Sequence, residues 1–451
     1  MAPPPPMPPP PPPSAPPPPV MPAMTQAPPA QGFPADSFNT EEYALLEENP
    51  FQDPALHPLS TFAIDVDPAS YANVRRFLSE GRLPPKDAVR IEELVNYFDY
   101  DYPSPAGEHP FSVTTEVAPA PWNPVHRLVH VGLQGRRVAE EDLPPANLVF
   151  LLDVSGSMAD YNKLPLVKTA LRMLVERLRE EDRVAIVVYA GAAGVVLPPT
   201  TGSDRRTILE ALERLDAGGS TAGGQGIRLA YRVARDGFRP GGNNRVILAT
   251  DGDFNVGVSS DAELVRMIEQ ERADGIALSV LGFGTGNVKD AKMEQLADRG
   301  NGNYAYIDGT QEARKVLVEE MGGTLLTIAK DVKVQVEFNP AEVQAYRLIG
   351  YENRLLAAED FDDDTRDAGE LGAGHSVTAL YEVVPVGAPS PARGTGPLRY
   401  QQTRPTRQAG PGGEPLHVKL PYQPPEGGAS RLVERPVRDR VTSTPSADFR
   451  F

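Results

Sequence analysis

The stretch LVFLLDVSGS, residues 148–157, decides the fold of this chain. Its first five residues are apolar, which is typical of a strand buried on both faces of a parallel sheet. The polar residues that follow, Asp153, Ser155 and Ser157, would then lie on a loop at the carboxyl end of that strand. Because α/β sheets bind ligands at this edge, the stretch predicts both a parallel sheet and a ligand site.

Short apolar runs alternate with amphipathic segments from residue 146 to residue 329. Short apolar runs predict further strands at residues 184–189, 246–249, 276–281 and 304–307. Amphipathic segments stand between them, and the clearest is residues 164–178, whose apolar residues recur at helical spacing. We therefore expect an α/β domain with a doubly wound, mostly parallel sheet of Rossmann-like type.

Strands of a different kind flank this domain. Apolar and polar residues alternate at 111–117 and 129–133, and again at 332–338, 377–383 and 416–420, which is typical of antiparallel strands with one buried face. We expect the strands at 110–135 to pair with the C-terminal ones in an antiparallel β-sandwich. The α/β domain would then be an insertion in this body.

Four regions follow from these patterns. Prolines make up seventeen of the first 30 residues, so residues 1–38 are predicted to be a disordered spacer, or a tail without function. Residues 39–145 form an N-terminal helical and β region, in which residues 39–102 have a helical pattern and Asp67 and Pro68 resemble an N-cap and first-turn pair. Residues 146–329 form the α/β domain, and residues 330–451 a β-rich C-terminal domain.

Composition excludes several classes of protein. The 451 residues include 44 Lys and Arg against 61 Asp and Glu, a net charge of -17 that is spread along the chain, so nucleic acid is not expected as a partner. The absence of cysteine excludes disulfides and thiolate metal sites. No apolar run approaches the roughly 18 residues of a membrane-spanning helix.

Three polar loops could meet at one edge of the predicted sheet. They are the loop at residues 153–157, the Gly-rich loop GGST at residues 218–221, and DGD at residues 251–253. They offer only carboxylate and hydroxyl oxygens, which suit Mg²⁺, or alternatively Mn²⁺ or Ca²⁺, rather than zinc. Hydroxyls binding directly, with carboxylates partly through water, would leave positive charge for an incoming Asp or Glu.

The order D-x-S-x-S, then Thr in a Gly-rich loop, then T-D-G resembles the metal-ion-dependent adhesion site of von Willebrand A and integrin I domains. The resemblance implies that Ser155, Ser157 and Thr221 are hydroxyl ligands of the metal. It implies carboxylate ligands, direct or through water, at Asp153 and Asp251.

A wider resemblance is carried by NTEEY at residues 39–43, PLSTF at 58–62, NYFDY at 96–100 and LIGYENR at 348–354. The chain is similar in these stretches to the bacterial YfbK-like von Willebrand A proteins. This implies a family-specific N-terminal region, the A domain, a C-terminal domain of unknown function, and an extracytoplasmic location, periplasmic or at the cell surface. No signal segment or lipid-anchor cysteine precedes the proline tract, so this location rests on the resemblance.

The function expected first is a metal-dependent, adhesion-type module that binds a protein through an exposed Asp or Glu. No G-x-S-x-G elbow, P-loop or H-E-x-x-H motif is present, so an enzyme is not expected. Two alternatives stay open at this point. One is a scaffold or adaptor for an ATPase or envelope complex, and the other is a metal-dependent hydrolase.

Overall fold

The computed structural model of the chain describes residues 41–219, 223–252, 261–320, 326–363, 368–391, 413–442 and 444–450. The predicted spacer at residues 1–38 and the predicted ligand Thr221 lie outside the described residues. Among the described helices, none is long and apolar enough to cross a membrane.

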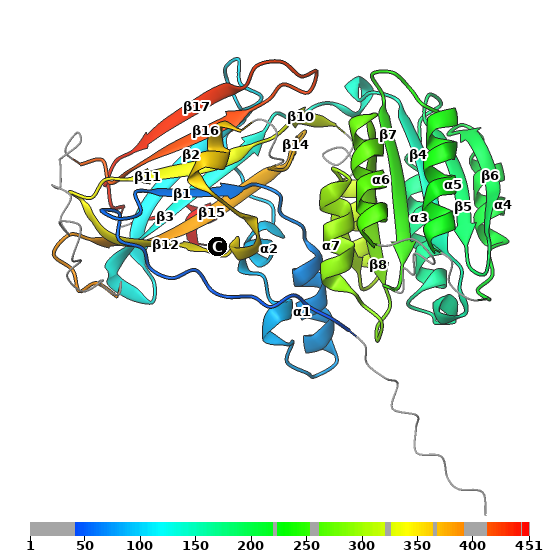
Figure 1. The fold of residues 1–451 in the computed structure, drawn as a ribbon, viewed down its shortest axis with the longest axis horizontal. Coiled ribbons are helices and arrows are strands. Elements are labelled where there is room, and N and C mark those ends of the chain that lie inside the picture. The colour runs from blue at the N-terminus through cyan, green and yellow to red at the C-terminus, as the bar shows by residue number, and fades with distance from the viewer. Residues whose placement is uncertain are drawn as a thin grey trace, which may run out of the picture. The chain divides into compact units, whose positions relative to one another are not determined.

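Six strands form one sheet in the order β6-β5-β4-β7-β8-β9 (Figure 1). Their bounds are Ala146–Asp153 (β4), Arg183–Tyr189 (β5), Ala193–Thr201 (β6), Asn243–Thr250 (β7), Ile276–Phe283 (β8) and Tyr304–Ile307 (β9). Neighbouring strands are parallel except for β5 and β6. All five strands expected from apolar runs are present, and residues 148–152 lie in β4, in the interior of the sheet.

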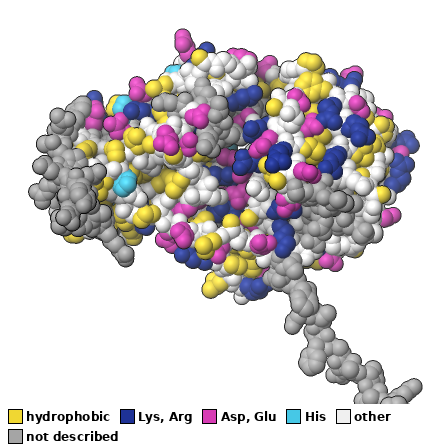
Figure 2. Space-filling model, in the orientation of Figure 1, with side chains coloured by type: hydrophobic (Ala, Val, Ile, Leu, Met, Phe, Trp, Pro, Cys, Tyr) yellow, Lys and Arg dark blue, Asp and Glu magenta, His cyan; other side chains and the backbone are white. Residues whose placement is uncertain are grey.

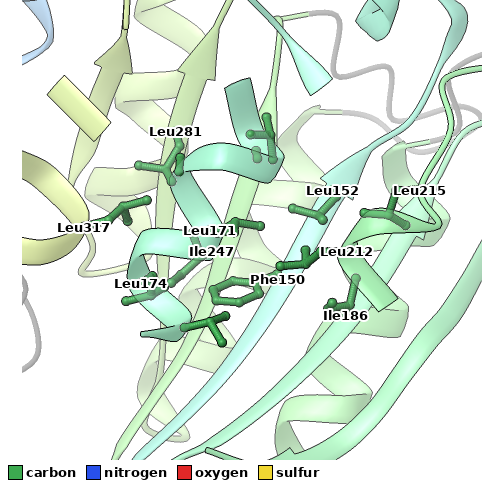
Figure 3. Packing of buried hydrophobic residues seen from close by; sticks show 14 of the residues in the cluster. Phe150, Leu152, Leu171, Leu174, Ile186, Leu212, Leu215, Ile247, Leu281 and Leu317 are labelled. Atoms are coloured by element: carbon green, nitrogen blue, oxygen red, sulfur yellow. The ribbon is translucent and has the colours of Figure 1, made fainter. Parts of the chain in front are cut away.

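Helices cover both faces of this sheet. One face carries α3 (Leu164–Val175), α4 (Arg205–Glu213) and α8 (Thr310–Arg314), and the other carries α5 (Gly223–Asp236), α6 (Asp261–Ala273) and α7 (Asp290–Arg299). The alternation of side chains along a strand supplies both cores. Phe150 of β4 packs toward α3 and α4 (Figure 3), whereas Leu151 faces α5. This is why β4 is apolar at each position from Leu148 to Leu152.

Two antiparallel sheets form a second body, with strand orders β13-β1-β11-β16-β17 and β12-β15-β3-β2. The first sheet contains Leu355–Leu356 (β13), Leu59–Ala63 (β1), Lys333–Phe338 (β11), Leu416–Tyr422 (β16) and Arg431–Val437 (β17). The second contains Val343–Ile349 (β12), Ser376–Pro385 (β15), Asn123–Gly135 (β3) and Phe111–Ala120 (β2). Phe62 and Val334 of one sheet share a hydrophobic core with Val131 of the other, so the sheets pack face to face as a sandwich.

The sandwich is built from both flanks of the α/β domain. Strand β1, which precedes that domain, pairs with β11, which follows it, and β3 pairs in the same way with β15. The expected fold class, a mostly parallel α/β sheet inserted in an antiparallel sandwich, is therefore confirmed. The linking segments meet at one place, since the amide of Gly374 donates to Arg136 O at 2.9 Å and that of Ala373 to Leu326 O at 2.8 Å. There, Thr327–Ala329 (β10) pairs with Leu371–Gly372 (β14).

Two expectations for the N-terminal region need correction. Residues 39–102 are not uniformly helical, because they contain β1 as well as α1 (Ala69–Ser79) and α2 (Ile91–Asn96). Asp67 does not cap α1, which has no side-chain cap. Its carboxylate instead accepts a hydrogen bond of 2.8 Å from the backbone amide of Tyr304. The buried Asp67 therefore provides a hydrogen-bond acceptor for the first amide of β9.

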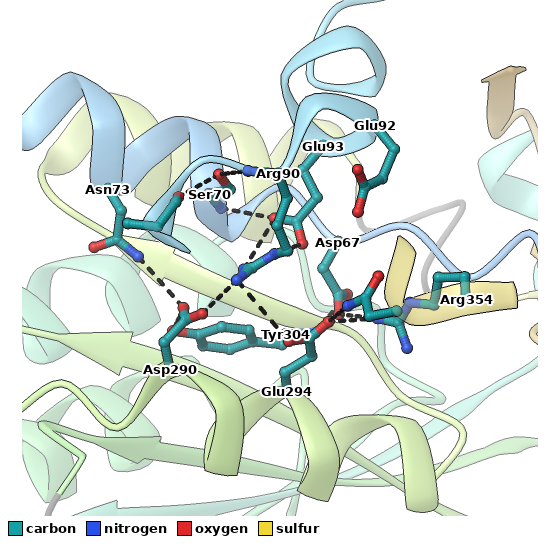
Figure 4. A network of polar contacts seen from close by, with 12 residues as sticks. Asp67, Ser70, Asn73, Arg90, Glu92, Glu93, Asp290, Glu294, Tyr304 and Arg354 are labelled. Carbon is teal, nitrogen blue, oxygen red and sulfur yellow. Dashed lines mark hydrogen bonds and ion pairs between the residues drawn. The ribbon is translucent and has the colours of Figure 1, made fainter. Parts of the chain in front are cut away.

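A buried cluster of charged side chains joins the N-terminal helical region, α7 and the 3-10 turn η5 (Glu352–Arg354) (Figure 4). We call this cluster the junction. Arg90 forms ion pairs with Glu93 and Asp290. Arg354 forms ion pairs with Glu294 at 2.9 Å and Asp298 at 2.6 Å. Since Glu294 and Asp298 both lie on α7, the junction fixes this helix to segments from both flanks.

Candidate metal centre

The first predicted loop begins where β4 ends, at the carboxyl edge of the parallel sheet. Asp153 is the last residue of β4 and is fully buried. One carboxylate oxygen accepts a hydrogen bond from the backbone amide of Ser155 at 2.8 Å, which closes a tight turn. The other accepts a hydrogen bond from the Thr250 hydroxyl of β7 at 3.4 Å. The turn therefore places Ser155 and the residues after it at the carboxyl edge of the sheet.

Two predicted hydroxyl ligands lie side by side on this turn. The Oγ atoms of Ser155 and Ser157 are 3.0 Å apart. Ser155 is 2% exposed, whereas Ser157 is partly exposed and Gly156 between them is open to solvent. A ligand could thus approach the hydroxyls from outside while the carboxylate stays buried.

The second predicted loop joins the first through backbone hydrogen bonds. The amide of Gly156 donates to Gly219 O at 3.0 Å, and the amide of Gly218 donates to Val154 O at 2.8 Å. The described part of this loop ends at Gly219, so the position of Thr221 stays a prediction.

The third predicted loop follows β7 and meets the first at the same edge. Thr250 links them, since its hydroxyl bonds to Asp153 and also accepts a hydrogen bond from the amide of Gly252 at 3.2 Å. Asp251 is 1% exposed, and its charge acts on Asp153. The structure thus brings together Asp153, Ser155, Ser157 and Asp251, four of the five predicted ligands.

Lys163 also reaches this site, although sequence reasoning did not select it. Its Nζ donates to Asp251 Oδ2 at 2.9 Å, and Lys163 is 4% exposed. The one sequence feature that could have indicated its role is the position of this cation, directly before the apolar face of the helix at residues 164–178. Such a residue is ordinarily expected to extend into solvent.

Burial and neighbouring charge dominate the electrostatics of the site. Burial raises the pKa of Asp153, hydrogen bonds from Ser155 lower it, and the charge of Asp251 raises it further. Asp153 and Asp251 are both buried, and the charge of one acts on the other. Such a pair of acidic groups favours a cation beside it.

The donor set fits a hard divalent ion. Within the described ranges, no three His, Cys, Asp or Glu side chains come together in a way that could hold a metal, so a metal here would depend on the Ser155 and Ser157 hydroxyls as well as on the carboxylates. Oxygen donors of this kind match Mg²⁺, Mn²⁺ or Ca²⁺. A divalent ion would provide an electrophilic position that a carboxylate can complete.

Comparison with sequence families agrees with this architecture. Residues 147–320 match the von Willebrand factor type A domain, residues 37–130 match a von Willebrand factor family, and residues 323–451 match the family described as "Uncharacterized protein YfbK, C-terminal". The chain is therefore a protein of the von Willebrand factor type A class, whose domain is a module commonly involved in protein–protein interaction.

One relative places it more closely. The chain is 46% identical over 419 residues to Uncharacterized protein YfbK of Escherichia coli (strain K12), which covers 91% of this chain and 72% of that protein. The chain belongs to the YfbK-like family, as the sequence resemblance predicted.

Two further proteins are similar to the chain at lower identity. The human inter-alpha-trypsin inhibitor heavy chain H3 is 28% identical over 204 residues, or 42% of this chain and 22% of that protein. The solved structure of a von Willebrand factor type A protein from Catenulispora acidiphila aligns with a TM-score of 0.45 at 20% identity, covering 76% of each chain.

Proposed function

We propose that Asp153, Ser155, Ser157 and Asp251, with Thr221 as a fifth ligand, bind a divalent ion at this edge of the sheet, with Mg²⁺ the first choice, and use it to hold an Asp or Glu of a protein partner. The observation that carries this proposal is the arrangement of Asp153 and the two serine hydroxyls, 3.0 Å apart, at the carboxyl end of a central strand. The partial exposure of Ser157, next to the exposed Gly156, leaves room for a ligand from outside.

We propose binding rather than catalysis. The Ser155 hydroxyl bonds to Ser157, and the Ser155 side chain also bonds to the Asp153 carboxylate. Neither partner is a histidine, the usual base of a serine nucleophile. Over the face shown in Figure 2, Lys and Arg side chains are intermingled with Asp and Glu. This supports a protein partner rather than nucleic acid, which calls for clustered cations. The extracytoplasmic location stays a prediction from the family.

Calorimetric titration of the full chain with MgCl₂ tests the metal site. The wild type should bind one ion, and Asp153→Asn should lose at least about ten-fold in affinity because a buried ligand oxygen is replaced by an amide. Asp236→Asn, at the exposed far end of α5, is the matched control and should bind as the wild type. Equal Mg²⁺ binding by wild type and Asp153→Asn would contradict the proposal.

The carboxylate partner is tested with a small probe. With Mn²⁺ in the site, acetate that coordinates the ion should show paramagnetic broadening of its methyl signal, and the neutral analogue acetamide should show much less. Broadening of acetate should disappear with Asp153→Asn. If acetate and acetamide are broadened alike, the site does not select a carboxylate.

A further inference from the structure

Lys163 occupies an unusual position for a buried cation. It immediately precedes α3, and its side chain is 5% exposed while that of its partner Asp251 is fully buried. The N-terminal end of a helix has a positive dipole and favours Ser, Thr, Asp or Asn rather than a cation. A lysine here is therefore unfavourable for α3 itself, and its ion pair with Asp251 offsets that cost.

The path of the Lys163 side chain depends on Gly284. A Cβ built on Gly284 would lie 2.4 Å from Lys163 Cε and 2.5 Å from its Cγ. Gly284 also has a φ of +75°, a conformation that other residues rarely adopt. The lysine stem therefore lies directly across the glycine backbone, which leaves room for this side chain to reach the metal edge.

The charges of the described groups discussed so far can be added up. Asp153 and Asp251 contribute one negative charge each, and Lys163 contributes one positive charge, so these three groups together carry one negative charge. A divalent ion would change that total to one positive charge. Without Lys163 the loaded site would be neutral, and a carboxylate ligand would make it negative.

We propose that Lys163 is a positioned cation of the metal site that makes the loaded site net positive and so selects a carboxylate over a neutral oxygen ligand. This inference rests on the proposed function and adds a specificity residue to it. Lys163 has two opposite effects. It weakens metal binding, because it repels the ion and neutralises Asp251, and it strengthens carboxylate binding, because it adds attraction for an anion.

The test is Lys163→Met, which keeps the length of the apolar stem and removes the charge. Relative to the wild type, we expect Mg²⁺ affinity to rise roughly ten-fold and acetate affinity for the Mn²⁺-loaded protein to fall roughly ten-fold. Acetamide should be unaffected, because it has no net charge. Lys168→Met is the matched control, since Lys168 lies on the same helix α3 and contacts the exposed Glu213 O.

The outcomes separate this inference from the proposed function. If wild type binds Mg²⁺ and Lys163→Met binds Mg²⁺ and acetate as the wild type does, or binds Mg²⁺ more weakly, Lys163 is only a structural ion-pair partner and this inference alone fails. If the wild type binds no divalent ion, both fail. Should Lys163→Met not fold, Lys163→Gln removes the charge while keeping a donor for Asp251, and the same two affinities decide.

Discussion

Gly252 lies directly after the predicted ligand Asp251 and has a φ of +107°. A Cβ at this position would lie 2.2 Å from Asn287 O and 2.8 Å from Lys289 N. Both are backbone atoms, so they cannot rotate away. We expect Gly252→Ala to lower the free energy of unfolding by about 3 kcal/mol, from the combined strain and overpacking, measured by urea denaturation.

A matched control separates the two causes. Gly81 also has a positive φ, +70°, but no atom lies within 4 Å of its Cβ position. Gly81→Ala should therefore show only the cost of the backbone conformation, about 1 kcal/mol. If Gly252→Ala lowers the free energy of unfolding no more than Gly81→Ala does, the backbone at residues 287–289 does not pack tightly against the Asp251 loop.

At the residue scale, the sequence could predict the side chains that stand in a local motif. Asp153, Ser155 and Ser157 fall within five residues and follow an apolar strand, so their grouping is visible without a structure. Lys163 and Thr250 were not selected as site residues, because their contacts join distant parts of the chain. A lysine next to an amphipathic helix also looks the same in sequence whether it reaches solvent or a buried carboxylate.

At the scale of elements, the junction around α7 holds more acid than base. Six carboxyl groups contact the guanidinium groups of Arg90 and Arg354, and they belong to Asp65, Asp67, Glu93, Asp290, Glu294 and Asp298. Two cations cannot balance six anions away from water. Some of these carboxyl groups therefore keep a proton at neutral pH, and burial raises the pKa of Glu93 to about 8 and that of Asp298 to about 7.

Stability should consequently fall as the pH rises through neutrality toward about 8. The folded chain keeps a proton on Glu93 that the unfolded chain releases near its usual pKa of 4.5, so the stabilisation is complete below 4.5 and is lost as the pH passes about 8. Between pH 6.5 and 8 this amounts to roughly 1–2 kcal/mol. Chemical denaturation across this range should show the decline.

Two variants test whether Glu93 causes this decline in stability with pH. Glu93→Gln, which imitates the protonated acid, should remove most of the decline and leave the smaller part that Asp298 contributes. Glu80→Gln on the exposed end of α1 should leave the decline unchanged. Measurements should stay above pH 6.5, because burial lowers the pKa of His130 to about 4 and gives an opposite dependence in acid. A decline that is the same in Glu93→Gln would place the titrating group elsewhere.

Burial also explains which elements the sequence could predict. The interior strands β4, β5, β7 and β8 contain mostly apolar runs because both faces are covered. Strands β6, β12 and β17 were not predicted, and each lies at the edge of its sheet; β1 was also missed, although it lies between β13 and β11. β6 contains two prolines and β17 is mostly exposed. An edge strand tolerates such residues, since one side of its backbone has no ladder partner.

At the scale of the whole molecule, the sandwich and the α/β domain have separate cores. The sandwich core contains residues of β1, β3, β11 and β15, whereas the α/β sheet supports one core on each face. An exception is α1, whose Ala69 and Ala72 pack into the core shared with α5 and α7. The alternating strand patterns predicted that both flanks would pair, but nothing in the pattern of α1 showed which body it would join.

The separate cores predict that the sandwich folds without its insertion. Arg136 and Leu326 bond to adjacent residues, Gly374 and Ala373, so a linker of about six Gly and Ser residues, reaching up to roughly 20 Å, should replace residues 139–325. We expect this deletion variant to unfold cooperatively and to keep slow amide exchange in β3 and β15. Helix α1 should lose protection, because its partners are gone. If β3 and β15 exchange as fast as α1, the sandwich depends on the inserted domain for its stability.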